Sequence, residues 1–263
     1  MNTIENTDIS NTQQLSTSKK IKQIDQINKL SETFIYQIIP LLLHNHYYNL
    51  SDISIFSKLC KSISNTDIYV KHISIKNSKL VNLLELKRFT NLQSIDLSSC
   101  EEITDITVIQ NLTNLQSLNI SRLYLITDIT VIQNLTNLQS LNISGLYELT
   151  DITVLQHLTN LQSLNISSNY KITALQHLTN LQSLDISYCY QITDITVLQH
   201  LTNLQSLYLF FCGQLTDITP LQDLTNLKIL NIIDCKIKDI TAIHHLTNLQ
   251  IIQPRKWIDT LKN

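Results

Sequence analysis

The chain has 263 residues, of which 43% are hydrophobic, and its formal net charge is −2. This balance gives no electrostatic reason to expect nucleic acid or an anionic membrane as a partner. Two glycines and three prolines exclude a collagen-like chain or a flexible linker. The longest apolar run, Phe34 to Leu43, contains Pro40 and is too short to span a bilayer.

Residues 1–28 are polar and lack sustained apolar periodicity, so we expect a disordered N-terminal tail. The first twenty residues also lack the apolar region of a secretory signal. The five cysteines are an odd number, which fits a reducing compartment. We therefore expect the chain to lie in the cytoplasm or the nucleus.

Residues 29–66 have a different character, with apolar side chains at spacings of three and four that predict two short helices. A polar break at residues 44–49 separates the two halves. The apolar positions are Leu30, Phe34, Ile35, Ile38, Ile39 and Leu42, then Leu50, Ile53, Phe56, Leu59, Cys60 and Ile63.

From Leu92 onward one phrase returns almost unchanged every 23 residues, with one interval of 20 and one of 22. We number each copy from the leucine that opens it. These leucines are Leu92, Leu115, Leu138, Leu161, Leu181, Leu204 and Leu227, and a partial copy begins at Leu249. A degenerate copy starts near Val70, with Ile73 and Ile75 in the strand positions.

Each copy reads LxxLxL, then usually Cys or Asn at position nine, then I/L-T-D-I-T. This pattern resembles the leucine-rich repeat family, which implies an α/β solenoid with a parallel sheet on its concave face. The resemblance places about eight repeats in residues 67–253. We expect residues 254–263 to form a C-terminal cap in which Trp257 covers the last coil.

Strand alternation predicts that positions one, four and six point into the core, as in Leu161, Leu164 and Ile166. In the return segment we expect Leu149, Ile152, Leu155 and Leu158 to face the core as well. Thr150 or Asp151 is expected to cap a short helical turn there.

At position nine the family buries an Asn or Cys that bonds to the neighbouring loop, which accounts for Cys100, Cys189, Cys212 and Cys235. Leu123 and Leu146 depart from this pattern, so their loops must satisfy backbone groups in another way. The copy that leads into Leu181 lacks three residues, which predicts a change of curvature near residues 170–180.

Information about a partner should lie where near-identical copies differ, at positions five, seven, eight and ten. The candidate partner-binding residues are Arg122, Tyr188, Tyr208, Phe210 and Phe211, because aromatic side chains and arginine dominate interface energies. The alternative for the tyrosines at position ten is that they only cover their neighbours. Those tyrosines are Tyr124, Tyr147, Tyr170 and Tyr190.

No pattern for catalysis stands out. His157, His177 and His200 fall in one column, but copying of the repeat explains them as well as a metal site does. We see no glycine-rich phosphate loop, CxxC pair or nucleophile–base arrangement. The expectation is a non-enzymatic protein without metal, catalytic residues or cofactor.

The segment 29–66 resembles an F-box, the helical motif that docks onto the Skp-family adaptor of cullin–RING ubiquitin ligases. Its first half matches LPxELLxxILxxL at the apolar positions, and its second half contains SKLCK, close to the family wording. The resemblance implies adaptor contacts by Phe34, Ile38, Leu42, Ile53, Phe56 and Leu59.

Together the two resemblances imply a substrate-recognition subunit of such a ligase, which holds an unknown target protein on the concave face of the solenoid. The alternative is an adaptor-independent intracellular scaffold in which the N-terminal helices only cap the repeats. A secreted adhesin of the internalin type is a third interpretation, which the short return segments favour.

Overall fold

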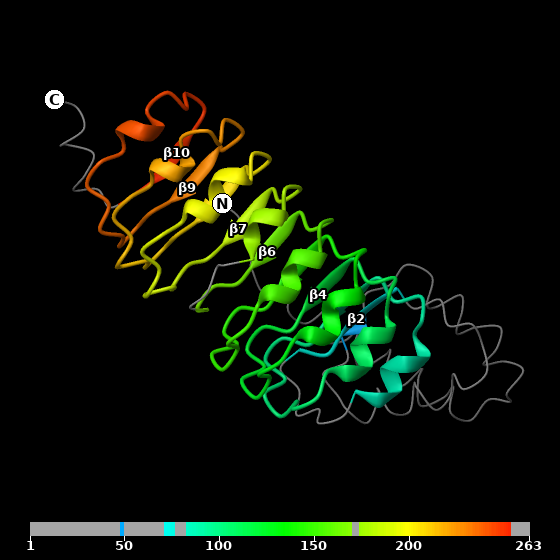
Figure 1. Cartoon of the computed structure of the whole chain (residues 1–263). Helices are drawn as coiled ribbons and strands as arrows, with labels where there is room; N and C mark the ends of the chain where they lie inside the picture. Colours follow the sequence, from blue (N-terminus) through cyan, green and yellow to red (C-terminus); the bar gives the residue numbers. More distant parts are fainter. Residues whose placement is uncertain (1–47, 50–70, 77–82, 170–173, 254–263) are drawn as a thin grey trace, which may run out of the picture.

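The computed structural model describes residues 48–49, 71–76, 83–169 and 174–253. Within these residues, ten strands form one parallel sheet in which spatial order follows chain order (Figure 1). The strands are β1 (Tyr48–Asn49), β2 (His72–Ser74), β3 (Ser94–Asp96), β4 (Ser117–Asn119), β5 (Ser140–Asn142), β6 (Ser163–Asn165), β7 (Ser183–Asp185), β8 (Ser206–Tyr208), β9 (Ile229–Asn231) and β10 (Gln250–Ile252). The expected solenoid with a parallel sheet is confirmed.

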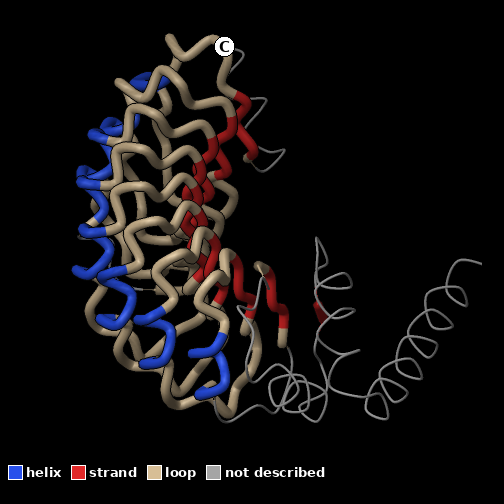
Figure 2. Tube along the Cα trace, turned by 90° about the vertical axis from the view of Figure 1, so that its right-hand side faces the viewer, coloured by secondary structure: helices blue, strands red, loops and turns tan. Residues whose placement is uncertain are grey.

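Short 3₁₀ helices carry the chain back along the opposite face (Figure 2). Strands line the inner side of the curved molecule in this view, and helices line the outer side. The helices are η1 (Leu84–Arg88), η2 (Thr107–Asn111), η3 (Thr130–Asn134), η4 (Thr153–His157), η5 (Leu175–His177), η6 (Thr196–His200), η7 (Thr219–Leu221) and η8 (Thr241–Ile243).

Between the two faces lies one continuous apolar core. Leu161, Leu164 and Ile166 are at most 1% exposed, as strand alternation predicts. The return-segment residues Leu149, Ile152, Leu155 and Leu158 are also buried. Each coil therefore shares its core with the coils on either side, which is why one repeat cannot be stable alone.

The polar column at position nine behaves as expected. Asn169 donates from Nδ2 to the Ile143 carbonyl of the previous coil at 3.3 Å. The thiols donate in the same direction: Cys100 to Ile75 at 3.0 Å, Cys189 to Ile166 at 3.9 Å, Cys212 to Ile186 at 3.3 Å and Cys235 to Leu209 at 3.0 Å. Leu123 fills the column as a buried apolar side chain. The Leu97 carbonyl that a polar residue there would reach keeps only the Cys100 N–H, at 3.1 Å, as a hydrogen-bond partner within its own coil.

Position eight of the repeats adopts a left-handed backbone conformation. The values of φ are 57° at Ser99, 59° at Arg122, 72° at Gly145, 65° at Ser168, 59° at Tyr188, 59° at Phe211 and 58° at Asp234. The N–H of Tyr188 donates to the Phe210 carbonyl in the next coil at 2.7 Å. Stacking of the coils imposes this conformation, at a cost of about 1–2 kcal/mol for a residue other than glycine.

At the N-terminal end, β1 pairs in parallel with β2, with Tyr48 opposite Ile73 and Asn49 opposite Ser74. This strand lies where the sequence predicts a polar break between two helices. The helices themselves fall outside the described residues, together with the six residues expected to bind an adaptor. Trp257 and the expected C-terminal cap lie outside them too.

The repeat with three missing residues keeps the sheet intact. Ser183, Leu184 and Asp185 of β7 pair in register with Ser163, Leu164 and Asn165 of β6. Its helix η5 has three residues, whereas η4 before it and η6 after it each have five. Because the strands pair in register, the missing residues fall in the return segment between β6 and β7, and the change of curvature near residues 170–180 stays a prediction.

Candidate protein-binding surface

The concave surface is polar over most of its length. The middle strands present serine at position three and Asn or Asp at position five, as Ser140 and Asn142 do in β5. Tyr208 of β8 interrupts this polar surface, with Asp185 opposite it on one side and Asn231 on the other. A partner on this face therefore meets a uniform amide and hydroxyl surface with one distinctive region.

The Asn or Asp at position five also holds the turn that follows each strand. Its side-chain oxygen accepts the N–H of position seven: Asp96 from Ser98 at 2.9 Å, Asn119 from Ser121 at 3.1 Å, Asn142 from Ser144 at 3.0 Å, Asn165 from Ser167 at 2.9 Å, Asp185 from Ser187 at 2.9 Å and Asn231 from Ile233 at 3.1 Å. Tyr208 carries no such oxygen beside its strand. The Phe210 amide therefore lacks the acceptor that holds the equivalent amide in the other repeats.

Four aromatic rings gather beyond the ends of β7 and β8, and we call Tyr188, Tyr190, Phe210 and Phe211 the aromatic cluster. Tyr188 stacks on Phe211, with ring centroids 5.4 Å apart and an angle of 12° between the planes. Phe210 packs edge-on against Tyr188 at 5.2 Å and against Phe211 at 4.4 Å. Tyr190 meets the edge of Tyr188 at 6.3 Å.

These rings are exposed to a degree that packing of the fold does not require. Tyr190 is 52% exposed, Tyr188 39% and Phe211 37%, while Phe210 is half-buried beneath them. Contiguous exposed aromatic side chains on a soluble protein mark an interaction surface. Of the residues predicted from the sequence, Tyr188, Phe210 and Phe211 therefore come together.

Two other residues predicted from the sequence are not part of the aromatic cluster. Tyr208 is half-buried on β8, and Arg122 is exposed at position eight three repeats earlier. Tyr190 belongs to the cluster, although the sequence left it with the tyrosines that cover their neighbours. The sequence could have placed Tyr190 beside Tyr188, because the two tyrosines flank the buried Cys189 in one turn.

A second aromatic pair lies further toward the N-terminus on the same edge. Tyr124 stacks on Tyr147 with ring centroids 5.8 Å apart and an interplanar angle of 8°. Tyr124 is half-buried, as the covering role predicts, and Tyr147 is 52% exposed. Tyr170, the next tyrosine at position ten, lies outside the described residues.

The edge that carries the cluster is acidic. The aspartate of each I/L-T-D-I-T phrase accepts the N–H of the threonine that begins the next helix, as Asp151 accepts from Thr153 at 2.8 Å. Asp151 therefore holds the turn that leads into η4, although the N-cap residue itself is Ile152 and its side chain makes no capping bond. The side-chain and backbone hydrogen bonds from Thr219 lower the pKa of Asp217, and those from Thr196 act in the same way on Asp194.

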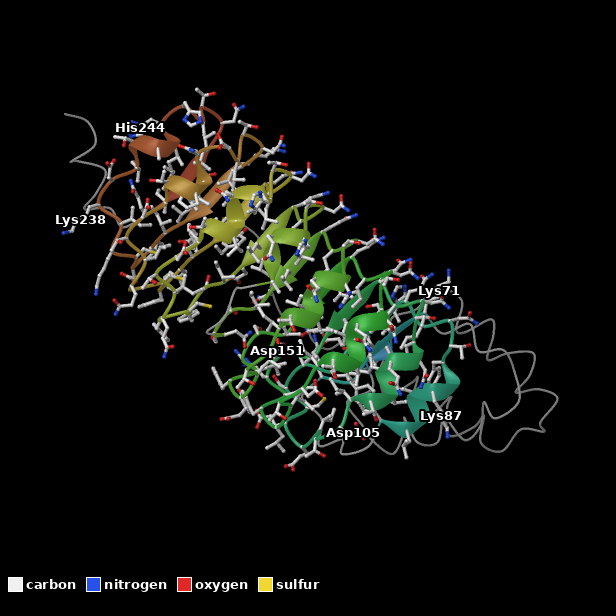
Figure 3. The ribbon with its side chains drawn as sticks, in the orientation of Figure 1. Lys71, Lys87, Asp105, Asp151, Lys238 and His244 are labelled. Atoms are coloured by element: carbon white, nitrogen blue, oxygen red, sulfur yellow. The ribbon has the colours of Figure 1, made fainter. Side chains whose placement is uncertain are left out.

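Figure 3 shows Asp105, Asp151 and Lys238 along this edge, with Lys71 and His244 on the other side of the solenoid. The opposite edge carries an open hollow of about 380 Å³ lined by amides alone: Asn137, Gln139, Asn160, Gln162, Asn180 and Gln182. The asparagines donate to the previous coil, as Asn160 Nδ2 does to the Thr136 carbonyl at 2.8 Å. The two edges therefore differ sharply in charge.

The histidine column does not gather into a metal site. The Nε2 atoms of His157, His177 and His200 lie 3.4, 3.3 and 3.1 Å from the Nε2 atom of the glutamine that precedes each histidine. Across the described part of the chain, no group of three His, Cys, Asp or Glu side chains is placed to hold a metal ion.

The same described residues include no helix with the length and apolar character needed to cross a membrane.

Two family models match the chain. The model of the leucine-rich repeat domain of the endo-β-N-acetylglucosaminidase EndoS matches residues 50–169, and a model of two leucine-rich repeats matches residues 179–223. The first match begins inside the segment 29–66 that resembles an F-box. No curated protein matches the chain.

Solved structures show the same architecture. Internalin C2 from Listeria monocytogenes is 29% identical, with a TM-score of 0.60 over 69% of this chain and 79% of that chain. The leucine-rich repeat protein LIC12759 from Leptospira interrogans is 20% identical, with a TM-score of 0.60 over 80% of this chain and 58% of that one. The leucine-rich repeat domain of the type III effector XopL is 21% identical, with a TM-score of 0.55 over 72% and 70% of the two chains. The similarity to LIC12759 and to XopL shows a shared fold alone.

Proposed function

We propose that this chain, which is a leucine-rich repeat protein, binds a partner protein through the aromatic cluster and the adjoining concave strands. Its repeats form a scaffold that presents side chains from successive coils at fixed spacing. Large aromatic side chains lose little conformational entropy on binding and dominate the energetics of protein interfaces. The observation that carries the proposal is the exposed contact of Tyr188, Phe210 and Phe211 across two coils.

The repeat that starts at Leu204 supports a role in binding rather than in folding. Tyr208 replaces the side chain that holds the turn, Phe210 replaces the usual serine, and Phe211 occupies a left-handed position. The first of these choices gives up a hydrogen bond in the turn, whereas the left-handed backbone of Phe211 is common to the repeats and its ring ends up partly exposed. Departures from a local rule without a gain in packing are expected at functional sites.

The test compares proteins retained by the immobilised full chain from a lysate of its source organism. The variants are the double substitution Tyr188→Ser with Phe211→Ser, and Tyr147→Ser as a control with an exposed tyrosine on the same edge. We expect at least one protein to bind the wild type and the control but not the double variant. An identical set of bound proteins for all three chains would contradict the proposal.

A second candidate function adds docking onto a Skp-family adaptor, so that the solenoid presents a target protein to a cullin–RING ubiquitin ligase. The SKLCK phrase and the apolar spacing of residues 30–63 support this role. Two observations favour the alternative that the segment closes the first coil. The strand β1 pairs with β2, and the repeat match begins at residue 50.

The adaptor role is tested by mixing the purified full chain with a purified Skp-family adaptor. If residues 30–63 act as an F-box, the two proteins co-elute in gel filtration, and Phe34→Asp with Leu59→Asp abolishes the complex. The pair Tyr188→Ser and Phe211→Ser serves as the control that leaves adaptor binding intact. No complex at high micromolar concentration would remove this candidate and leave the partner-binding scaffold.

A further inference from the structure

We propose that the aromatic cluster recognises an arginine side chain on a basic segment of the partner protein. This inference rests on the proposed function and specifies the chemistry of the partner. It depends on three features of the surface: the arrangement of the rings, the carboxylates beside them and the polar residues around both.

The rings form a supported platform. Phe210 stands nearly perpendicular to Tyr188 and Phe211, at 88° and 76°, and contacts both. Because Phe210 is half-buried, it holds the two outer rings in place while they remain partly open to solvent. The face of an aromatic ring carries partial negative charge and attracts a cation that lies over it.

Two carboxylates belong to the coils of the platform and the coil after it. Asp185 on β7 stands opposite Tyr208 in the sheet, and Asp234 occupies position eight in the coil after Phe211. Asp185 accepts the Ser187 N–H at 2.9 Å and an Asn165 Nδ2 proton at 3.2 Å, so its position is held. Asp234 is exposed. The carboxylate partners available to a cation over the rings are therefore Asp234 in the next coil and Asp185 in the coil of Tyr188.

The charge around the cluster remains acidic further out. Asp194 and Asp217 lie on the same edge in the coils that contain Tyr188 and Phe211. The exposed lysines that follow the cluster in the chain are Lys228, whose Nζ donates to Gln205 Oε1 at 3.1 Å, and Lys236 and Lys238 in the last full coil. A basic segment that follows the edge across these coils meets carboxylates in each of them, which favours its approach at low ionic strength.

Arginine fits this combination better than the other side chains. Its planar guanidinium stacks on an aromatic ring and donates to a carboxylate at the same time. A purely apolar partner segment would bury the exposed Asp234 carboxylate without pairing it, which is unfavourable. An acidic segment would be repelled by Asp194, Asp217 and Asp234 in the coils that carry the cluster and the coil after it. The occupant is therefore a basic segment with at least one arginine.

The experiment titrates the full chain into fluorescent peptides of twelve residues with blocked ends, followed by anisotropy. One peptide alternates arginine with glycine and serine, and the others carry lysine, glutamine or glutamate in place of each arginine. We expect the arginine peptide to bind most tightly, the lysine peptide more weakly, and the neutral and acidic peptides not measurably. Affinity for the arginine peptide should fall as salt is raised.

Variants of the chain separate ring chemistry from apolar area. Tyr188→Leu keeps an apolar side chain without a π system and should weaken the arginine peptide roughly fivefold, whereas Tyr188→Phe should leave it unchanged. Asp234→Asn should weaken binding and make it less sensitive to salt. Tyr147→Ser is the matched control on the same edge and should bind as the wild type does. Melting temperatures of all variants show that each is folded.

Equal affinity for the arginine and glutamine peptides would overturn the inference, as would equal binding by the Tyr188→Leu and Tyr188→Phe variants. The same holds if Tyr147→Ser weakens binding as much as Tyr188→Leu. If none of the peptides binds while the double variant still loses a partner protein, the proposed function stands and the arginine assignment fails.

Discussion

At the scale of single residues, position eight shows that the fold constrains the backbone conformation but leaves the side chain free to face the surface. The backbone there requires positive φ, and Gly145 satisfies this without strain in its repeat. Two later coils place Tyr188 and Phe211 in the same conformation. Since the coil-to-coil hydrogen bond uses only the backbone N–H, the ring itself adds nothing to that bond.

The first prediction concerns Phe211. Both Phe211→Ala and Phe211→Gly remove the ring, but only glycine also relieves the left-handed strain. After allowing for the greater freedom of glycine in the unfolded chain, we expect the glycine variant to be more stable by roughly 0.5–1 kcal/mol. Urea denaturation of the two variants measures the difference. An alanine variant as stable as the glycine variant would show that position eight is not strained.

The second prediction concerns the buried thiol of Cys189. Burial raises its pKa from 9.0 to about 12, so the folded state keeps a proton that the unfolded chain releases. The contribution of this thiol to the free energy of unfolding is fully present below about pH 9 and is lost as the pH rises toward 12. We expect the free energy of unfolding to fall more steeply above about pH 9 for the wild type than for Cys189→Ala.

Urea denaturation at a series of alkaline pH values provides the measurement. Groups that do not interact with Cys189 contribute equally to both proteins, so the difference between the two curves reports the Cys189 thiol together with its effect on the pKa of Cys212. Parallel curves would mean that the thiol is accessible to water in the folded state.

At the scale of one element, β8 and the turn after it give up a stabilising hydrogen bond and place an aromatic side chain on the surface. In the other repeats, an Asn or Asp at position five accepts the amide of position seven, as Asn231 accepts from Ile233 at 3.1 Å. Tyr208 gives up that bond and places an aromatic side chain on the concave face. The resulting surface is distinctive because the repeat pattern is broken there.

The third prediction restores the pattern. Tyr208→Asn gives the Phe210 amide an acceptor and should raise the free energy of unfolding by about 0.5–1.5 kcal/mol. It should also weaken partner binding, because it removes an aromatic side chain beside the cluster. Thermal and urea denaturation check the first effect, and the capture experiment checks the second. A destabilised variant would show that the Tyr208 ring contributes more to packing than the missing hydrogen bond costs.

At the scale of the whole molecule, each coil is stabilised by its two neighbours, so the ends of the solenoid matter most. The strand β1 supplies backbone partners to one edge of β2, as the pairing of Tyr48 with Ile73 shows. Whatever else residues 29–66 do, this pairing makes part of the segment a structural component of the first coil.

The fourth prediction follows from that pairing. Deletion of residues 1–66 removes β1 and should lower the melting temperature, whereas deletion of residues 1–47 keeps the strand and should lower it less. Differential scanning calorimetry of both truncated chains and the full chain provides the comparison. If both truncated chains melt at the temperature of the full chain, β1 adds no stability and the segment is free to serve a partner.

The sequence by itself determined the solenoid, its register and most of its core. These features repeat, so one pattern of leucines and one polar residue at position nine specifies every coil, including the cysteines that bond to the coil before them. It also pointed to Tyr188, Phe210 and Phe211, because they differ between copies that are otherwise nearly identical. Such inferences need only the local chain and its period.

Only the tertiary structure decided which of the variable residues form one surface. Tyr188 and Phe211 come into contact because stacking of the coils brings together residues 23 positions apart, and their left-handed backbones aim both rings outward at that edge. Tyr190 joins them from the coil of Tyr188, Arg122 lies three coils away, and Asp234 occupies position eight of the coil after Phe211. Contacts between coils depend on the direction of each side chain as well as on its position in the repeat, and sequence spacing does not specify that direction.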